Sequence, residues 1–278
     1  MGIGTLAHTV GHLPLKELTQ KLSGRGIDFV QLALSKAISD YDTSLGKLSP
    51  ALANHIGEQF DRAGVRIGVL GCYINPINPD VQQRRYEIDR FKEHLRYARD
   101  FGTSIVATET GDLATYLTQD ATGYEAIGWS ILRQTVEELA EEAERWGVHI
   151  GLEPVYTHTL SSTEKMARIL DEVPSSTLGV VFDPVNLIPP TVVEPQDQGK
   201  FLDHAFAAFG SRIVLVHLKD YIVNNGQKNE LASGKGIFET TSFLSKLHKA
   251  KPGIDISLEC LEDQTIEETF RYVRNLLT

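Results

Sequence analysis

Residues 180–188 read VVFDPVNLI, an apolar run that ends in a carboxylate and turns at once on a proline. A run of this length and composition is typical of a strand buried on both faces, as in a parallel sheet. Asp183 therefore stands at the end of a strand whose other residues are predicted to be buried in the core. Its position needs an explanation, because an unpaired carboxylate is costly to bury.

Similar apolar runs recur along the whole chain. Eight segments are short, rich in valine, isoleucine and leucine, and mostly without strict polar alternation, which predicts strands of a parallel sheet. They span residues 4–10, 28–35, 65–74, 104–111, 149–155, 178–185, 212–220 and 255–261.

Helix signals fill the intervals between these segments. Residues 49–64 begin with serine and proline, which predicts an N-cap and a first helical residue. Apolar spacing at i, i+3 and i+4 predicts helices over residues 80–102 and about 122–146. Two further starts resemble capping boxes, at residues 161–164 and 265–268.

Eight strands, each followed by a helix, predict an α/β fold, the (β/α)₈ TIM barrel, as one domain over residues 1–278. The chain is slightly longer than the roughly 250 residues typical of this fold. A doubly wound open sheet is the alternative. That fold is expected to have a glycine-rich turn after its first strand, whereas the sequence there is HTVGHLP.

Composition restricts the class of protein. Of the 278 residues, 41% are hydrophobic and the net charge is −10, so nucleic acid and anionic membranes are poor partners. Cys72 and Cys260 form no CxxC pair, which suits a reducing cytoplasm and argues against a zinc-thiolate site. No signal peptide or membrane-length apolar run is visible, and we expect a cytoplasmic location.

The last four predicted strands each carry a metal-binding type of residue near the carboxyl end: Glu153, Asp183, His217 and Glu259. In a barrel the side chains of a strand alternate between interior and helix layer, and chemistry is found at the carboxyl-terminal rim. The residues two positions earlier are expected to form the layer beneath: Gly151, Val181, Leu215 and Ser257. The intervening residues are expected to face the helices: Leu152, Phe182, Val216 and Leu258.

Three carboxylates and an imidazole converging on one rim predict a bound cation. Buried like charges repel one another, and a divalent ion both offsets the charge and accepts the four ligands. The oxygen-rich set suits one Mn²⁺ or Mg²⁺ ion, with Mn²⁺ favoured and Zn²⁺, Co²⁺ or Fe²⁺ as alternatives. Any one of these residues alone is better explained as a salt bridge or a helix cap.

These strand ends resemble the xylose isomerase-like TIM-barrel superfamily of sugar isomerases, epimerases and AP endonucleases. The resemblance is sharpest in GLEPV, FDPVN, VHLKD and SLECL, and extends to SGKGIFETTSFLSKL at residues 233–247. It implies one metal ion held by Glu153, Asp183, His217 and Glu259. It also implies that Glu153 and Glu259 act as acid and base on opposite sides of one substrate carbon.

The resemblance implies an isomerase or epimerase of a small sugar or sugar phosphate that works through an enediolate. An inosose-type dehydratase and a non-catalytic sugar-binding barrel are the alternatives. Asn186 replaces a histidine that the ketose 3-epimerases commonly have, and Lys219 and Asp220 stand near the position of their arginine. The substrate contacts are therefore expected to differ from those of the 3-epimerases. The trinuclear zinc site of endonuclease IV is not expected, because its additional histidines are missing.

Four further residues are candidates for substrate binding: Glu109, His158, Asn186 and Lys219. Lys219 is expected to face the interior with His217, where it would bind substrate or pair with a rim carboxylate such as Glu109. His158 lies in a loop and would contact substrate or be solvated. Gly234 to Gly236 would form an anion nest or belong to a mobile surface loop over residues 221–238. Family members are often dimers or tetramers, which suggests a homo-oligomer.

Overall fold

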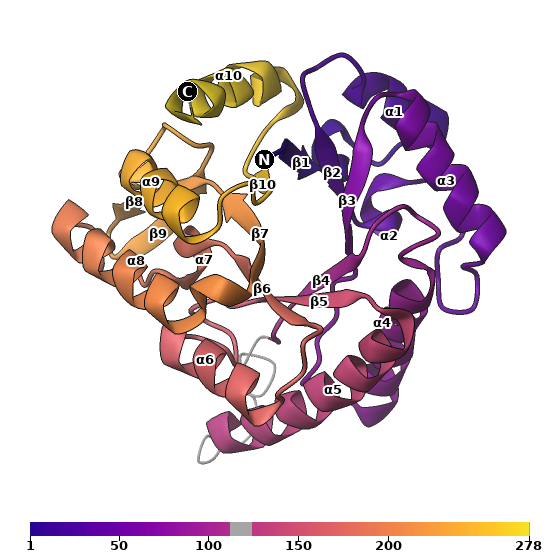
Figure 1. Ribbon diagram of the computed structural model, residues 1–278, viewed down its shortest axis with the longest axis horizontal. Coiled ribbons are helices and arrows are strands. Elements are labelled where there is room, and N and C mark those ends of the chain that lie inside the picture. Colours follow the sequence, from indigo (N-terminus) through magenta and orange to yellow (C-terminus); the bar gives the residue numbers. More distant parts are fainter. Residues whose placement is uncertain (112–123, 278) are drawn as a thin grey trace.

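The computed structural model describes residues 1–111 and 124–277. Within these residues eight parallel strands close into a barrel, and helices surround it (Figure 1). The strands are β1 Ile3–Leu6, β2 Phe29–Leu32, β3 Arg66–Gly71, β4 Ile105–Glu109, β5 His149–Glu153, β6 Leu178–Phe182, β7 Ile213–Leu218 and β10 Ile256–Leu258. The predicted (β/α)₈ barrel is confirmed. The doubly wound alternative is wrong, because the last strand, β10, pairs with β1 and leaves no open edge.

Helices follow the strands in the predicted alternation. Those of the described residues are α1 Leu15–Leu22, α2 Leu34–Ala37, α3 Pro50–Arg62, α4 Val81–Tyr97, α5 Tyr124–Trp146, α6 Thr163–Glu172, α7 Pro184–Leu187, α8 Pro195–Phe209, α9 Thr240–Ala250 and α10 Ile266–Leu277, with 3₁₀ turns η1 Ala7–Val10, η3 Gly210–Arg212 and η4 Asp263–Thr265. Residues 122 and 123 of the predicted helix lie outside the described residues. None of the described helices has the length and apolar character needed to cross a membrane. The cytoplasmic location, the oligomeric state and the single-domain boundary 1–278 stay predictions.

Of three N-caps predicted from the sequence, the structure has one at the predicted residue and two at other residues. Ser49 caps α3, since its hydroxyl accepts a hydrogen bond from the Leu52 N–H at 3.2 Å. For α6 the cap is Ser162, one residue later than predicted, because two adjacent serines offer the same hydroxyl. Thr265 does not cap α10, since η4 precedes that helix and Thr265 forms a capping box with Glu262.

All eight barrel strands end two to four residues earlier than predicted, and β1 and β6 show how the chain turns at the barrel rim. β1 stops at Leu6, and the following residues form η1 in place of the predicted strand to residue 10. β6 stops at Phe182, and Asp183 caps the short helix α7, whose first residue is Pro184. A proline has no N–H for the strand ladder but suits the first turn of a helix. The Asp-Pro pair therefore converts a strand into a helix within two residues.

The predicted alternation along the last four strands agrees with the packing. A small cluster inside the barrel contains Phe29, Val69, Ala107, Val181 and Leu215. The outward residues Leu152, Phe182, Val216 and Leu258 belong to the larger core between barrel and helices. Phe182, for example, packs edge-to-face on Phe209 with ring centroids 5.2 Å apart.

Residues 221–238 do not form the expected surface loop. They contain most of an antiparallel hairpin, β8 Asp220–Asn224 and β9 Gln227–Leu231, whose tip residues Asn225 and Gly226 have φ of 52° and 76°. Positive φ at both tip residues is typical of a type I′ turn, which fits the twist of two paired strands. The hairpin is anchored by Tyr221, which is fully buried.

The expected anion nest at residues 234–236 is filled by the chain itself. The Asp220 carboxylate accepts hydrogen bonds from the N–H groups of Gly234 at 3.0 Å and Phe238 at 2.8 Å. Gly236 packs so closely on the Tyr221 carbonyl that a side chain has no room. Because a carboxylate already occupies this position, a phosphate site there is excluded.

Candidate metal centre and substrate cavity

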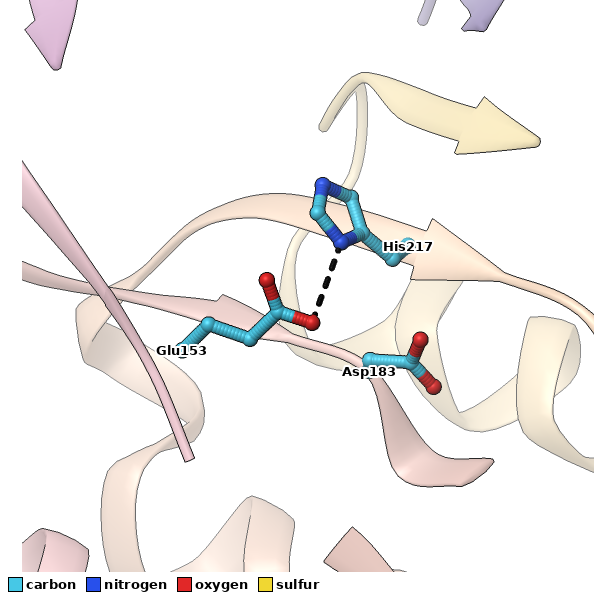
Figure 2. Close-up of side chains that lie close together, drawn as sticks. All are labelled: Glu153, Asp183 and His217. Atoms are coloured by element: carbon cyan, nitrogen blue, oxygen red, sulfur yellow. Dashed lines mark hydrogen bonds and ion pairs between the residues drawn. The ribbon is translucent and has the colours of Figure 1, made fainter. Parts of the chain in front are cut away.

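Three consecutive barrel strands place two carboxylates and an imidazole together (Figure 2). Glu153 ends β5, Asp183 follows β6 and His217 lies in β7. All three side chains are buried, and one ligand atom of each lies within 4.8 Å of the others. The sequence predicted this convergence, because the carboxyl ends of parallel strands meet at one rim.

The structure explains why Asp183 stands at the end of a buried strand, because its two carboxylate oxygens have different contacts. Its Oδ1 atom accepts the Asn186 N–H at 3.0 Å and so caps α7. Its buried Oδ2 atom has no hydrogen bond, although it lies 3.2 Å from the Lys219 ammonium. Burial raises the pKa of Asp183 to about 6, with Lys219 opposing the rise.

Glu153 is held as a carboxylate by its neighbours. The side-chain amide of Asn186 donates to its Oε1 atom at 2.7 Å, so that α7 orients a residue of β5. Burial by itself raises the pKa of Glu153, but attraction to His217 and Lys219 outweighs this and lowers it. Asn186, predicted as a substrate ligand, thus positions one carboxylate of the cluster.

The imidazole of His217 is oriented by Gln31 of β2. The His217 Nε2 atom lies 2.9 Å from the Gln31 amide oxygen, and the Gln31 amide nitrogen donates to the Tyr73 hydroxyl at 2.8 Å. Because an amide oxygen only accepts, Nε2 carries the proton. The Nδ1 atom then faces the cluster, in the way that a second partner fixes the tautomer of a metal-binding histidine.

The environment of His217 Nδ1 requires positive charge. Glu153 lies 3.3 Å and Glu259 3.1 Å from this nitrogen. A lone pair facing two carboxylates would be repelled, so a proton or a cation has to lie between them. Burial lowers the pKa of His217, but Glu259 and Glu153 outweigh it and raise it to about 9. In the absence of metal, the proton fills this role.

Glu259, the predicted fourth ligand, lies beside the cluster rather than within the group of three. It follows β10, and its carboxylate lies between His217 Nδ1 and the Lys219 ammonium, 3.2 Å from the latter. The next residue, Cys260, has a φ of 54°. A left-handed backbone is unfavourable for a residue with a side chain and is often found at functional sites.

Lys219 is buried among carboxylates, as one of its two predicted roles required. Its ammonium lies 3.2 Å from both Asp183 and Glu259 and 2.8 Å from Glu230. Burial lowers the pKa of Lys219, but these carboxylates outweigh it and raise the pKa above its ordinary value. Glu109, suggested as its partner, is not among these contacts.

A cavity of about 320 Å³, here called the mouth cavity, opens beside this cluster. Six predicted site residues line it: Glu109, Glu153, His158, Asn186, Lys219 and Glu259. Asp183 and His217 are fully buried and do not line it. The cavity is also lined by His8 and by three residues that the sequence did not reveal: Lys36, Tyr73 and Glu230.

Glu109 and His158 form the side of the mouth cavity remote from the hairpin. The His158 Nδ1 atom lies 3.9 Å from the Glu109 carboxylate, and the His158 side chain is only 12% exposed. The lone loop histidine is therefore packed rather than freely solvated. Burial, together with repulsion from Glu153 and Glu259, raises the pKa of Glu109 to about 7.

Two of the missed residues had no clear sequence signal. Glu230 lies on β9, in a polar segment that predicted a loop, and reaches the site only because the hairpin folds back. Tyr73 follows β3, and its hydroxyl bonds to Gln31. Burial and the nearby Glu259 raise the pKa of Tyr73, so it stays a neutral phenol.

The three clustered residues fit a divalent cation. Two carboxylate oxygens and one imidazole nitrogen suit Mn²⁺, Fe²⁺, Co²⁺ or Zn²⁺, and Mg²⁺ accepts the oxygens. The buried Asp183 Oδ2 atom, which has no hydrogen bond, and the Nδ1 atom of His217 both face the cluster. A cation there would be coordinated by both atoms.

Comparison with known proteins identifies the family. A family model described as xylose isomerase-like TIM barrel matches residues 20–276. The chain belongs to this xylose isomerase-like family. A search among curated proteins finds no match.

Solved structures resemble this xylose isomerase-like barrel over nearly its whole length. A D-tagatose 3-epimerase-like protein is 20% identical, covers 100% of this chain and 97% of its own, and has a TM-score of 0.79. The IOLI protein with a binding zinc atom is 18% identical over 100% and 96%, with a TM-score of 0.72. The 3-keto-D-glucoside 4-epimerase YcjR from E. coli is 14% identical over 99% of each chain, with a TM-score of 0.71. At these identities the likeness shows the fold alone.

Proposed function

We propose that this protein is a divalent-metal-dependent isomerase or epimerase of a small sugar. One observation carries the proposal: Glu153 and Glu259 approach the same nitrogen of His217, and both line the mouth cavity. Their strands, β5 and β10, lie on opposite sides of β7 in the barrel. A substrate carbon in the cavity would therefore meet a carboxylate from each side. The sugar epimerases among the similar structures support the same chemistry.

Glu153, Asp183 and His217 would hold the metal, with Glu259 as the fourth ligand, and Mn²⁺ is the ion we favour. When bound, the cation polarises a substrate oxygen and acidifies the neighbouring C–H bond. Glu153, kept ionised and oriented by Asn186, would remove the proton from that carbon. Glu259 would return a proton from the other side and so invert the centre.

The charges of the site favour a sugar without phosphate. Lys219 is already surrounded by Asp183, Glu230 and Glu259, and so has little attraction left for an added anion. Asp220 fills the glycine-rich nest at residues 234–236. Glu109 and His158 would instead contact hydroxyl groups at the far side of the mouth cavity.

The proposal is tested with Mn²⁺-reconstituted protein and a panel of D-fructose, D-tagatose, D-xylose and an inosose in D₂O. Deuterium in an epimer or isomer, detected by NMR, is the expected result. Loss of water would indicate the dehydratase instead. If the protein binds metal but exchanges no deuterium into any sugar and releases no water, both enzymatic hypotheses are contradicted. The non-catalytic sugar-binding barrel would then be the remaining hypothesis.

A matched pair of variants tests the role of Glu259. Glu259→Gln is expected to abolish exchange and to keep the fold. Glu230→Gln removes another carboxylate that lines the same cavity and contacts the same lysine. It is expected to keep most of the activity, and equal losses in the two variants would contradict the assignment.

A further inference from the structure

A second cavity of about 320 Å³ lies beside the mouth cavity. Tyr73, Glu109 and His158 line both. The second cavity extends past Asn75 to Glu87 of α4. A ligand in the mouth cavity would therefore have open space beyond Tyr73 and Glu109, in the direction away from the metal ligands.

A third cavity of about 490 Å³ adjoins the second at Glu87. It lies between the segment after β2 and helix α4, and its described lining includes Ser35, Ser39, Thr43, Tyr86 and Arg90. Arg90 lines the third cavity, and its guanidinium donates to the carbonyl of Tyr73, which lines the other two, at 2.6 Å. We call these three neighbouring polar cavities together the rim groove.

The rim groove has the surface chemistry that a sugar ring requires. Among the described residues, the hydroxyls of Ser35, Ser39 and Thr43 form no hydrogen bond with the protein, which leaves them available to a ligand. Tyr86 is 40% exposed and offers a ring face. Sugars combine an apolar C–H face with hydroxyl edges, and tyrosine combines an apolar ring with a polar tip.

The charge of the third cavity favours a neutral ligand. Of its described lining, Arg90 is the one lysine or arginine, and its guanidinium already bonds to a backbone carbonyl. Asp42 and Glu87 are the acidic residues there. A phosphate or carboxylate would meet these two carboxylates without a free cation to offset them.

We propose that the substrate is a glycoside or disaccharide, with its reacting ring in the mouth cavity and its second ring or aglycone in the second and third cavities of the rim groove. This inference rests on the proposed function, since it names the substrate class of the same site. The mouth cavity, at about 320 Å³, is near the lower end of ligand pockets, which span roughly 300–1,000 Å³. A free monosaccharide would leave the second and third cavities to water.

Binding measurements test the inference independently of turnover. Mn²⁺-loaded protein is titrated with cellobiose, maltose and isomaltulose, and with D-glucose and D-fructose, and followed by calorimetry and saturation-transfer NMR. At least one disaccharide is expected to bind about tenfold or more tightly than its matching monosaccharide, since two or three added hydrogen bonds suffice for that ratio.

Variants of the third cavity show where the gain arises. Tyr86→Ala, and Ser39→Trp as a filling substitution, are expected to remove the disaccharide advantage and to leave monosaccharide binding unchanged. Tyr272→Ala, which truncates a tyrosine of similar exposure on α10, is the matched control and should keep the advantage. Thermal unfolding verifies that each variant folds.

The outcomes separate the two proposals. Equal affinity for monosaccharides and disaccharides in the wild type would overturn the rim-groove inference and leave the proposed function standing. A disaccharide advantage that survives both Tyr86→Ala and Ser39→Trp would also overturn it. If none of the five sugars binds and the exchange experiment in D₂O fails too, both proposals fall.

Discussion

Glu109 and Glu153 are the same residue type, directly paired across β4 and β5, yet they have opposite surroundings. The Glu153 side chain is 5% exposed and that of Glu109 is 43% exposed. The pKa of Glu153 is lowered despite burial, because His217 and Lys219 attract its negative charge. The pKa of Glu109 is raised to about 7 by burial and by repulsion from Glu153.

This pair marks a boundary between two halves of the barrel mouth. Strands β5, β6, β7 and β10 carry the buried charges of the candidate metal centre. Strands β1 to β4 carry Gln31 and Glu109, and Tyr73 directly follows β3. The comparison teaches that cations keep a strand-end carboxylate ionised only where their attraction exceeds the cost of burial. For Glu153 the attraction of His217 and Lys219 does so, whereas for Glu109 the attraction of Lys36 and Lys219 does not.

The largest expected difference concerns catalysis. Glu153→Gln removes the proposed base and is expected to lower kcat by about 10³-fold, within the range of general acid–base effects of roughly 10²–10⁴. Glu109→Gln removes the paired carboxylate and is expected to stay within about tenfold of the wild type. Steady-state rates on whichever sugar shows exchange measure both. If kcat falls by a similar factor in Glu153→Gln and Glu109→Gln, the two halves of the barrel mouth do not differ in catalytic role.

The next largest effect concerns metal affinity. Asp183→Asn keeps a side chain that caps α7 but loses the charge at Oδ2, so the fold should persist. We expect Mn²⁺ affinity to fall by more than about 100-fold. Loss of a residue that only hydrogen-bonds to a metal ligand lowers metal affinity by about 10–100-fold, and loss of a ligand itself should exceed that. Equilibrium dialysis with atomic absorption measures it. Unchanged affinity would remove Asp183 from the metal site.

A smaller effect is expected from the outer partner of His217. Gln31→Leu removes the hydrogen bond that holds the proton on Nε2, and we expect Mn²⁺ affinity to fall about 10–100-fold. Gln198→Leu removes another buried glutamine, on α8, and serves as control. The control should lower thermal stability without altering Mn²⁺ affinity. Gln31 has a purely structural role if both variants behave alike.

The smallest effect is a pH dependence of stability in the metal-free protein. Glu109 titrates near its ordinary value of 4.5 when unfolded and near 7 when folded. Between these pH values the folded chain retains a proton that the unfolded chain lacks, so stability falls as pH rises from 4.5 through 7.

Glu109→Gln removes this dependence. It should raise the melting temperature by roughly 2 °C at pH 8 and by less at pH 5, since about 2–4 °C corresponds to 1 kcal/mol in chains of this size and solvent weakens the effect at a partly exposed group. Scanning calorimetry of both proteins measures the gap. A gap that narrows with rising pH would contradict the sign.

Most of the charged half of the mouth was predictable from the sequence, whereas in the other half the sequence indicated Glu109 but not Lys36 or Tyr73. Glu153, Asp183 and His217 stand out because each ends an apolar strand, where an ionisable residue has no packing role. Gln31 sits in an equally apolar strand, but an uncharged amide is compatible with the core. Its partner His217 is 186 residues away, and no local pattern indicates that contact.

Errors in the predicted elements have a similar cause. The hairpin at residues 220–231 has a polar sequence, so its strands lack the apolar signal of the barrel strands. Glu230 could therefore not be placed at the site. The anion nest at residues 234–236 was recognised by its glycines, but its occupant, Asp220, becomes visible only in three dimensions.

Among the described residues, the hairpin reaches the site through Glu230, which pairs with Lys219 and accepts a hydrogen bond from the Cys260 thiol. Lys228 fixes the hairpin to the carbonyl of Ile188 at 2.9 Å. Its strands belong to a separate two-stranded sheet and pair with none of the barrel strands. Exchange of these dozen residues would leave every barrel hydrogen bond intact. The hairpin can therefore be exchanged without rebuilding the strands that position Glu153, Asp183 and His217.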